Sequence, residues 1–214
     1  MIKGLELEAG SRSIGKEAEK LGMRVFSSDI EPFDNIDYVV DIFNFDYAKV
    51  PFIPDFIWAS PPCQGFSVAA IGKNWVSGEP FTPKTESAKL GIRLLKKNLE
   101  IIEHYLKLNP NLIFWFENPR GKMRKAPFLE HITRHTVTYC QYELDKPANE
   151  RRMKPTDIWT NSKTWVPRTM CKNGDPCHIA APRGSKTGTQ GLKGSYERSK
   201  LPPWLCIEIL KSLL

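Results

Sequence analysis

Short β-branched or aromatic runs alternate with helix-forming stretches through residues 1–120, and this alternation constrains the fold more than any other feature. Between two of these runs, leucine and isoleucine recur every three or four positions, which predicts a helix over residues 86–108. Strands separated by helices predict a parallel sheet in an α/β domain. The expected strands cover residues 2–8, 24–29, 38–42, 55–60 and 112–116.

Residues with useful chemistry come at or just past the ends of these runs. A glycine turn at Gly10 follows the first run and leads into a predicted helix over residues 11–21, which ends at Gly22. In parallel sheets, ligands bind outside the carboxyl ends of the strands. The sequence therefore predicts a site at that edge. The residues at strand ends are Gly10, Asp29, Asp41, Cys63 and Glu117.

Charge is unevenly distributed along the 214 residues. Residues 118–214 carry 18 Lys and Arg against 8 Asp and Glu, whereas residues 1–117 carry 13 against 16. A basic half is typical of proteins that bind a phosphate backbone, although a solvated charged face has the same composition. Strands are expected at residues 132–142 and 156–160, and residues 161–200 are expected to be irregular.

The start of the chain and its cysteines indicate an intracellular protein. No run approaches the roughly 20 apolar residues of a membrane span, and the first residues lack a secretory h-region. Five cysteines are an odd number, which favours reduced thiols over a disulfide framework. We therefore expect a cytoplasmic protein without membrane contact.

Two motifs carry the chemistry. Two prolines hold Cys63 on a stiff backbone at the end of an expected buried strand, which is how a nucleophile is positioned. An isolated cysteine beside a turn is usually structural, but a second motif changes the balance. Glu117 ends an aromatic strand, where apolar surroundings should raise the pKa of its carboxyl and make it a proton donor at neutral pH.

With these motifs the sequence resembles the DNA cytosine carbon-5 methyltransferase family, in particular its compact versions from phage genomes. Pro62-Cys63-Gln64 followed by Phe66-Ser67 is similar to the nucleophile motif of that family, and Glu117-Asn118 to its acid motif. The order of the motifs agrees, and residues 139–161 and 196–206 look like the same compact proteins. The resemblance covers nearly the whole chain and implies a Rossmann-like, S-adenosylmethionine-dependent methyltransferase fold with a mostly parallel sheet.

The resemblance implies a reaction. A Cys63 thiolate would attack carbon 6 of cytosine, which activates carbon 5 to accept a methyl group, and Glu117 would protonate or hydrogen-bond ring nitrogen 3. An arginine assists at the carbonyl oxygen of the base in this family. Here the family's two spaced arginines are replaced by the adjacent Arg151 and Arg152, so which one acts stays open. The target cytosine must be flipped out of double-stranded DNA.

The resemblance also implies an S-adenosylmethionine site. Asp29 matches the acid that pairs with the ribose hydroxyls, Ile30 the apolar contact to adenine, and Asp41 the acid near the adenine amino group. At the family's usual aromatic position this chain has Glu8, which removes apolar contact and adds negative charge. The complete set of expected cofactor-binding residues is Glu6, Ala9, Gly10, Ser11, Asp29, Ile30, Asp41, Ile42 and Pro61.

The family's large target-recognition region is much reduced. We expect a catalytic and cofactor-binding domain over residues 1–160, a small irregular recognition segment over 161–200, and a C-terminal helix over 201–214 that packs on the catalytic domain. The protein is expected to be a monomer. The expected DNA-binding residues are Gln64, Ser67, Arg168, Arg183 and Lys186.

No metal site is predicted. Cys171, Cys177 and His178, with Cys140 or Cys206 in possible reach, are ligand types for zinc, but their spacing is not that of a standard finger, and free thiols in a loop are the simpler interpretation. Two other functions stay open. The same cysteine and glutamate would serve cytosine in a tRNA loop, and a chain with Glu8 and no recognisable final cofactor motif could be a DNA-binding remnant without turnover.

Overall fold

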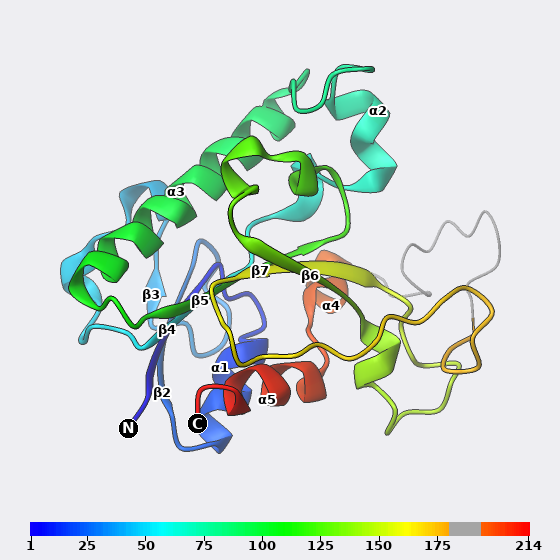
Figure 1. The fold of residues 1–214 in the computed structure, drawn as a ribbon. Helices are drawn as coiled ribbons and strands as arrows, with labels where there is room; N and C mark the ends of the chain where they lie inside the picture. Colours follow the sequence, from blue (N-terminus) through cyan, green and yellow to red (C-terminus); the bar gives the residue numbers. More distant parts are fainter. Residues whose placement is uncertain (180–193) are drawn as a thin grey trace.

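The computed structural model describes residues 1–179 and 194–214, and its centre is a seven-stranded sheet (Figure 1). The strands lie in the order β3-β2-β1-β4-β5-β7-β6. The first five are parallel, and β7 runs antiparallel to both of its neighbours. The strands are β1 Lys3–Leu7, β2 Arg24–Asp29, β3 Tyr38–Val39, β4 Phe56–Ala59, β5 Ile113–Pro119, β6 Thr133–Thr138 and β7 Pro155–Thr160.

This order confirms the predicted α/β fold with a mostly parallel sheet. The sequence of strands 3-2-1-4-5 is the doubly wound arrangement, in which the chain reverses its direction of travel between β1 and β4. Ligands of such sheets bind at that reversal, outside the carboxyl ends of the strands. The loops after β1 and β4 carry the motifs with Gly10 and Cys63.

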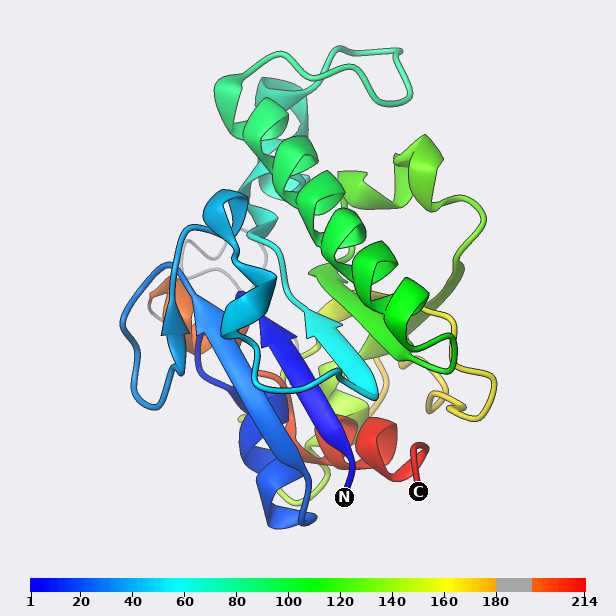
Figure 2. The ribbon, with the colours of Figure 1, turned by 90° about the vertical axis from the view of Figure 1, so that its left-hand side faces the viewer.

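One face of the sheet is covered by the long helix α3 (Glu86–Leu108), whose bounds match the prediction (Figure 2). The hydroxyl of Thr85 accepts a hydrogen bond from the amide of Ala88 and caps the helix. Buried side chains of α3, including Leu95 and Ile102, pack in one cluster with Ile57 of β4. The apolar spacing of three and four residues thus produces the buried stripe of the helix.

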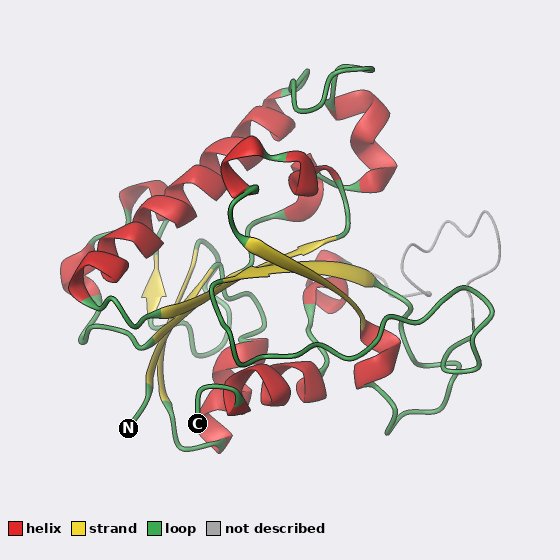
Figure 3. Cartoon of the chain, viewed as in Figure 1, coloured by secondary structure: helices red, strands yellow, loops and turns green. Residues whose placement is uncertain are grey.

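The opposite face is covered by α1 (Ser13–Lys20) and α5 (Pro203–Lys211), so helices lie on both sides of the sheet (Figure 3). Leu205 and Ile209 of α5 pack with Trp58 of β4 and Trp115 of β5. Side chains alternate across the sheet, so Trp58 and Trp115 face α5 while their neighbours face α3. Glu117 lies two residues beyond Trp115 and therefore points to the α1 and α5 side.

Several elements differ from expectation at their ends. The strand expected over 38–42 stops at Val39, because the Asp41 carboxylate accepts the amide of Phe43 and caps a 3₁₀ turn. β5 continues to Pro119 instead of ending at Phe116, since β7 pairs with it there. The strand expected over 132–142 is β6 followed by the 3₁₀ turn η7 (Tyr139–Tyr142).

The rest of the described chain is mostly loop. Residues 161–179 form no helix or strand, as expected, and the short helix α4 (Ser195–Ser199) precedes α5. Helix α2 (Ile71–Asn74) lies between β4 and α3. Among the described residues, no helix has the length and apolar character needed to span a membrane.

Candidate active site

The loop after β4 carries Cys63 to the carboxyl edge of the sheet. Backbone amides of Phe66 and Ser67 donate to the carbonyl of Cys63, at 3.0 and 2.9 Å, and close the 3₁₀ turn η3 (Cys63–Gly65). The side-chain amide of Asn118, on β5, donates to the carbonyl of Pro61 at 2.8 Å. This bond ties the prolines before Cys63 to the strand end that carries Glu117, so the two motifs are fixed relative to each other.

Glu117 is buried at the end of β5. Its Oε1 accepts a hydrogen bond from the hydroxyl of Tyr139 at 3.3 Å. Burial raises the pKa of the Glu117 carboxyl, while the positive charge of Lys154 and the bond from Tyr139 oppose the rise. The net effect favours the protonated form more than at an exposed glutamate, which is the state a proton donor needs.

A cavity of about 840 Å³ opens at this edge and joins the two motifs to the end of β1. It lies at the reversal between β1 and β4, as the doubly wound order predicts. Its volume falls within the range typical of ligand pockets. Of the predicted site residues, the cavity is lined by Glu6, Ala9, Gly10, Ser11, Pro61, Cys63, Gln64, Ser67 and Glu117.

Lys154 is a cavity residue that the sequence analysis did not single out. Its ammonium group is buried, donates to the carbonyl of Arg198 at 2.9 Å and lies 4.7 Å from the ring centroid of Tyr139. Burial lowers the pKa of Lys154, and the negative forms of Glu117 and Cys63 counteract this. The only signal in the sequence was a third cation close after Arg151 and Arg152, just before the strand expected at residues 156–160.

The thiol of Cys63 has a raised pKa. Burial is the largest cause, and the negative charge of Glu117 adds to it, whereas Lys154 and Arg198 lower the pKa. Reaction therefore requires a proton to leave a thiol that is mostly protonated at neutral pH. The two cations are the groups in the cavity that favour the thiolate.

Arg151 and Arg152 do not line the cavity. Arg151 donates to the carbonyls of Leu144, Lys146 and Cys177. The guanidinium of Arg152 binds both the carboxylate of Glu143 and the carbonyl of Lys200, and it lies over the ring of Tyr139. Their expected part in catalysis stays a prediction, and the cation that the structure places at the cavity is Lys154.

Glu8 does not bring the negative charge to the site that the sequence suggested. Its Oε2 accepts a hydrogen bond from the side-chain amide of Asn98 at 3.0 Å, and burial raises the pKa of the carboxyl to about 8. At neutral pH the group is therefore mostly neutral. Its buried Oε1 has no hydrogen-bond partner among the described residues, which leaves one polar atom in the cavity wall for a ligand.

Glu6 and Asp29 shape the turn after β1. Oε1 and Oε2 of Glu6 accept the amides of Ile14 and Gly15, each at 3.1 Å, at the amino end of α1. Burial raises the pKa of Glu6 to about 7. Asp29 accepts the amide of Gly10 at 2.8 Å. Gly10 has φ of +51°, which glycine adopts readily, and this turn brings its backbone to the cavity.

The other expected ligand-binding residues lie outside the cavity lining, and their roles stay predictions. Both carboxylate oxygens of Asp29 accept hydrogen bonds from backbone amides, and Ile30 is exposed. Asp41 caps the 3₁₀ turn η1 (Ile42–Asn44), and Ile42 belongs to the core. Arg168 binds Glu208 and the carbonyl of Gln141. Arg183 and Lys186 lie outside the described residues.

A second cluster lies beside the cavity. The thiols of Cys140, Cys171 and Cys177 and the Nδ1 atom of His178 come together, although the spacing of these residues argued against a metal site. Cys206, which was considered with them, is buried in the α1 and α5 core instead.

The sheet order and the cavity at its reversal define the class of protein: a doubly wound, Rossmann-like α/β domain. The chain is 29% identical over 228 residues to a Frog virus 3 protein named "Probable DNA (cytosine-5)-methyltransferase", with 96% of this chain and 97% of that protein covered. The resemblance to the DNA cytosine carbon-5 methyltransferase family is thereby confirmed over almost the whole chain. No family model matches the chain.

Solved structures with similarity to the chain are larger proteins. They include DNMT2 of Spodoptera frugiperda, with 17% identity and a TM-score of 0.47, and a proposed DNA modification methyltransferase from an E. coli prophage, with 15% identity and a TM-score of 0.45. They cover 79% and 80% of this chain. The chain spans about half of the length of these proteins, 55% and 52% respectively.

Proposed function

We propose that this protein is a DNA (cytosine-5)-methyltransferase that uses S-adenosylmethionine. The observation that carries the proposal is the single cavity in which the thiol of Cys63, the carboxyl of Glu117 and the turn at Gly10 meet. A nucleophile, a buried acid and a backbone turn suited to a small-molecule ligand are the three parts that this reaction needs. The similarity to the viral protein supports the same reading.

The cavity residues fit the cofactor. Ala9 and Gly10 present backbone at the reversal between β1 and β4. The Oε1 atom of Glu8, which has no hydrogen-bond partner within the described part of the chain, offers a polar contact there. Because Glu8 is mostly neutral at neutral pH, it places little negative charge in the site. S-adenosylmethionine supplies the methyl group when bound.

Residues of the chain then carry out the remaining steps. The Cys63 sulfur forms a bond to carbon 6 of cytosine, after its proton leaves, and Glu117 donates a proton or hydrogen bond to ring nitrogen 3. The added electron density makes carbon 5 nucleophilic towards the methyl group. Loss of the carbon 5 proton then expels the Cys63 thiolate and restores the aromatic ring. The base must leave the duplex to reach the cavity, and the protein would act on it as a monomer.

The first experiment is methyl transfer to unmethylated duplex DNA of varied sequence, mapped by bisulfite sequencing. We expect methylated cytosines with the wild type and none with Cys63→Ala. Glu117→Gln should retain folding and lose about 10²- to 10⁴-fold in rate, because the proton donor is removed. A duplex that carries 5-fluorocytosine should trap a covalent complex with the wild type and not with Cys63→Ala, since carbon 5 then has no proton to lose.

Two outcomes would overturn the proposal. Preference for tRNA over duplex DNA in the same assay would assign the chemistry to RNA. Absence of cofactor binding by calorimetry, in the presence of DNA that the protein does bind, would identify a remnant without turnover.

A further inference from the structure

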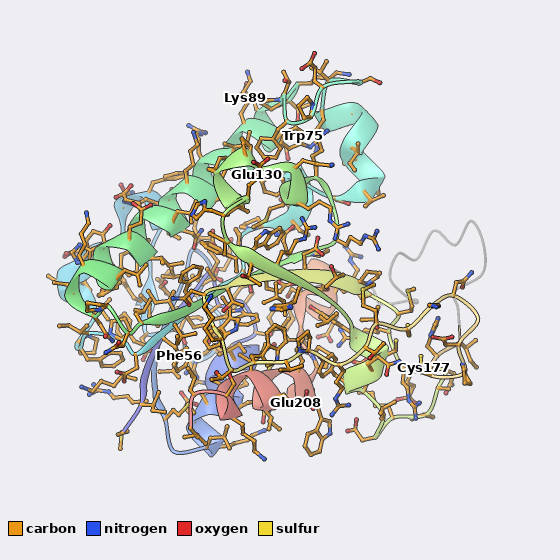
Figure 4. All side chains as sticks on the ribbon, viewed as in Figure 1. Phe56, Trp75, Lys89, Glu130, Cys177 and Glu208 are labelled. Atoms are coloured by element: carbon orange, nitrogen blue, oxygen red, sulfur yellow. The ribbon has the colours of Figure 1, made fainter. Side chains whose placement is uncertain are left out.

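We propose that Cys140, Cys171, Cys177 and His178 form a structural zinc site beside the catalytic cavity. Their four ligand atoms all lie within 4.8 Å of one another. Cys140 belongs to η7, after β6, and the other three belong to the loop after β7, so the cluster joins two distant parts of the chain. Figure 4 labels Cys177 on that loop, away from the long helix α3.

The separations match the edges of a zinc tetrahedron. With Zn–S of about 2.3 Å and Zn–N of about 2.0–2.1 Å, sulfur atoms should lie about 3.8 Å apart and sulfur and nitrogen about 3.5 Å apart. The Sγ atom of Cys140 lies 3.7 Å from that of Cys177 and 3.1 Å from that of Cys171. Nδ1 of His178 lies 3.4 Å from the sulfur of Cys177 and 3.8 Å from that of Cys171. The other two pairs lie within 4.8 Å. A zinc ion would therefore need a small opening of the shortest edge and a closing of any long edge by up to about 1 Å.

Local structure directs the ligands toward a common centre. The backbone amide of Lys172 donates to the Asp175 carboxylate at 2.6 Å, which closes a turn between Cys171 and Cys177. The amide of Cys171 donates to the hydroxyl of Thr138 at 3.0 Å and holds this end of the loop against β6. The turn explains how five intervening residues can return both thiols to one point, which the spacing alone did not indicate.

The charge around the cluster suits a zinc thiolate centre. When Zn²⁺ binds, the three thiols release their protons to solvent and the imidazole binds through its unprotonated Nδ1. The complex of three thiolates, one neutral imidazole and Zn²⁺ carries one net negative charge. Arg151 donates to the carbonyl of Cys177 at 3.3 Å, so a cation lies beside this charge, together with the carboxylate of Asp175. Arg151 does not line the cavity, and this contact gives it a role beside the cluster.

The site would be structural. All four tetrahedral positions are taken by protein side chains, which is the arrangement of structural rather than catalytic zinc. Residues 161–179 have no helix or strand to hold them, and the ion would fix this loop to the sheet edge through Cys140. His178 and the neighbouring Asn173 also line the catalytic cavity. Zinc would therefore hold one wall of the substrate cavity in place.

The test begins with the zinc content of the full-length protein, produced with zinc and purified under reducing conditions. We expect one zinc per chain. Replacement by Co²⁺ should give the visible bands of tetrahedral cobalt and a near-ultraviolet sulfur-to-cobalt charge-transfer band. Cys177→Ser should weaken the binding of Co²⁺ by at least about tenfold and reduce the charge-transfer intensity.

Two control variants test the zinc site independently of the proposed methyl-transfer reaction. Cys63→Ser removes a thiol outside the cluster and His131→Ala an imidazole outside it, and both should keep one zinc per chain. Because metal content is measured without methyl transfer, an inactive protein that holds zinc would leave this proposal standing. A reduced wild type that binds neither Zn²⁺ nor Co²⁺ would overturn it, as would equal affinity of Cys177→Ser and the wild type.

Discussion

At the scale of single residues, Lys154 faces the two groups whose protonation the proposed reaction must control. Its charge lowers the pKa of both Cys63 and Glu117. Lys154→Met should raise the pKa of Cys63, so the rising limb of the pH profile of kcat/KM should move to higher pH. At neutral pH the rate should fall about tenfold for each unit by which the thiol pKa rises.

A second variant of Lys154 distinguishes the effect of its charge from the effect of its packing. Lys154→Arg keeps the positive charge and should hold the rising limb near that of the wild type. A methionine variant with a lower rate at every pH and no displacement of the limb would show that Lys154 acts through packing alone.

Glu8 gives a prediction about stability. Its pKa is about 8 in the folded protein against 4.5 for a free glutamate, so the unfolded chain loses this proton first as the pH rises. The stability that the folded protein gains from binding this proton more tightly is fully present below pH 4.5 and is lost as the pH rises towards 8. The glutamine of Glu8→Gln does not titrate. The free energy of unfolding of this variant should therefore increase relative to that of the wild type by up to about 1.4 kcal/mol per pH unit in that window.

Urea unfolding of the two proteins at several pH values between 4.5 and 8 measures this gain. Glu103→Gln, on the exposed surface of α3, is the matched control and should retain the pH dependence of the wild type. A constant difference between Glu8→Gln and the wild type across the window would contradict the burial of a neutral Glu8.

At the scale of elements, the segment after β5 and the loop after β4 are locked by a close backbone contact. A Cβ atom added at Gly121 would lie 2.3 Å from the carbonyl oxygen of Phe66, and the amide of Lys122 donates to the same oxygen at 2.8 Å. Gly121→Ala should therefore cost about 1–3 kcal/mol of stability and displace the turn that carries Cys63. The midpoint temperature of thermal unfolding and the rate of methyl transfer should both fall.

Gly72→Ala, in α2, is the matched substitution, because no described atom lies within 4 Å of its added Cβ. It should be neutral or stabilise the protein by up to about 1 kcal/mol, as expected for alanine in a helix. Equal stability of the two alanine variants would show that the loop after β4 can move to accommodate the added methyl group without loss of free energy of unfolding.

Some helix and strand boundaries were predictable from the sequence and others were not. The bounds of α3 could be predicted because the stripe of Leu95 and Ile102 is local and periodic. The ends of β5 and β6 could not, because their lengths depend on pairing with β7. The cysteine cluster was not predicted as a metal site because Cys140 lies far from the other three residues in the chain, and because the spacing of Cys171 and Cys177 does not encode the turn that brings them together.

At the scale of the whole molecule, helices cover both faces of the sheet, so the carboxyl edge of the strands is where a large substrate can reach the site. Arg120 is exposed at this edge and lines the cavity, whereas Lys107 is exposed near the opposite edge, just before β5. If DNA binds over the cavity, Arg120 contacts phosphate and Lys107 does not. The net charge of +7 alone would not distinguish the two.

The salt dependence of duplex binding tests this placement. Each phosphate contact contributes about −0.9 to the slope of log affinity against log salt concentration. Arg120→Ala should therefore make the slope shallower by about one contact and weaken binding for all sequences alike, because phosphate contacts carry no sequence information. Lys107→Ala should leave the slope of the wild type unchanged. Equal slopes for both variants would mean that DNA approaches the molecule from a direction other than the carboxyl edge of the sheet.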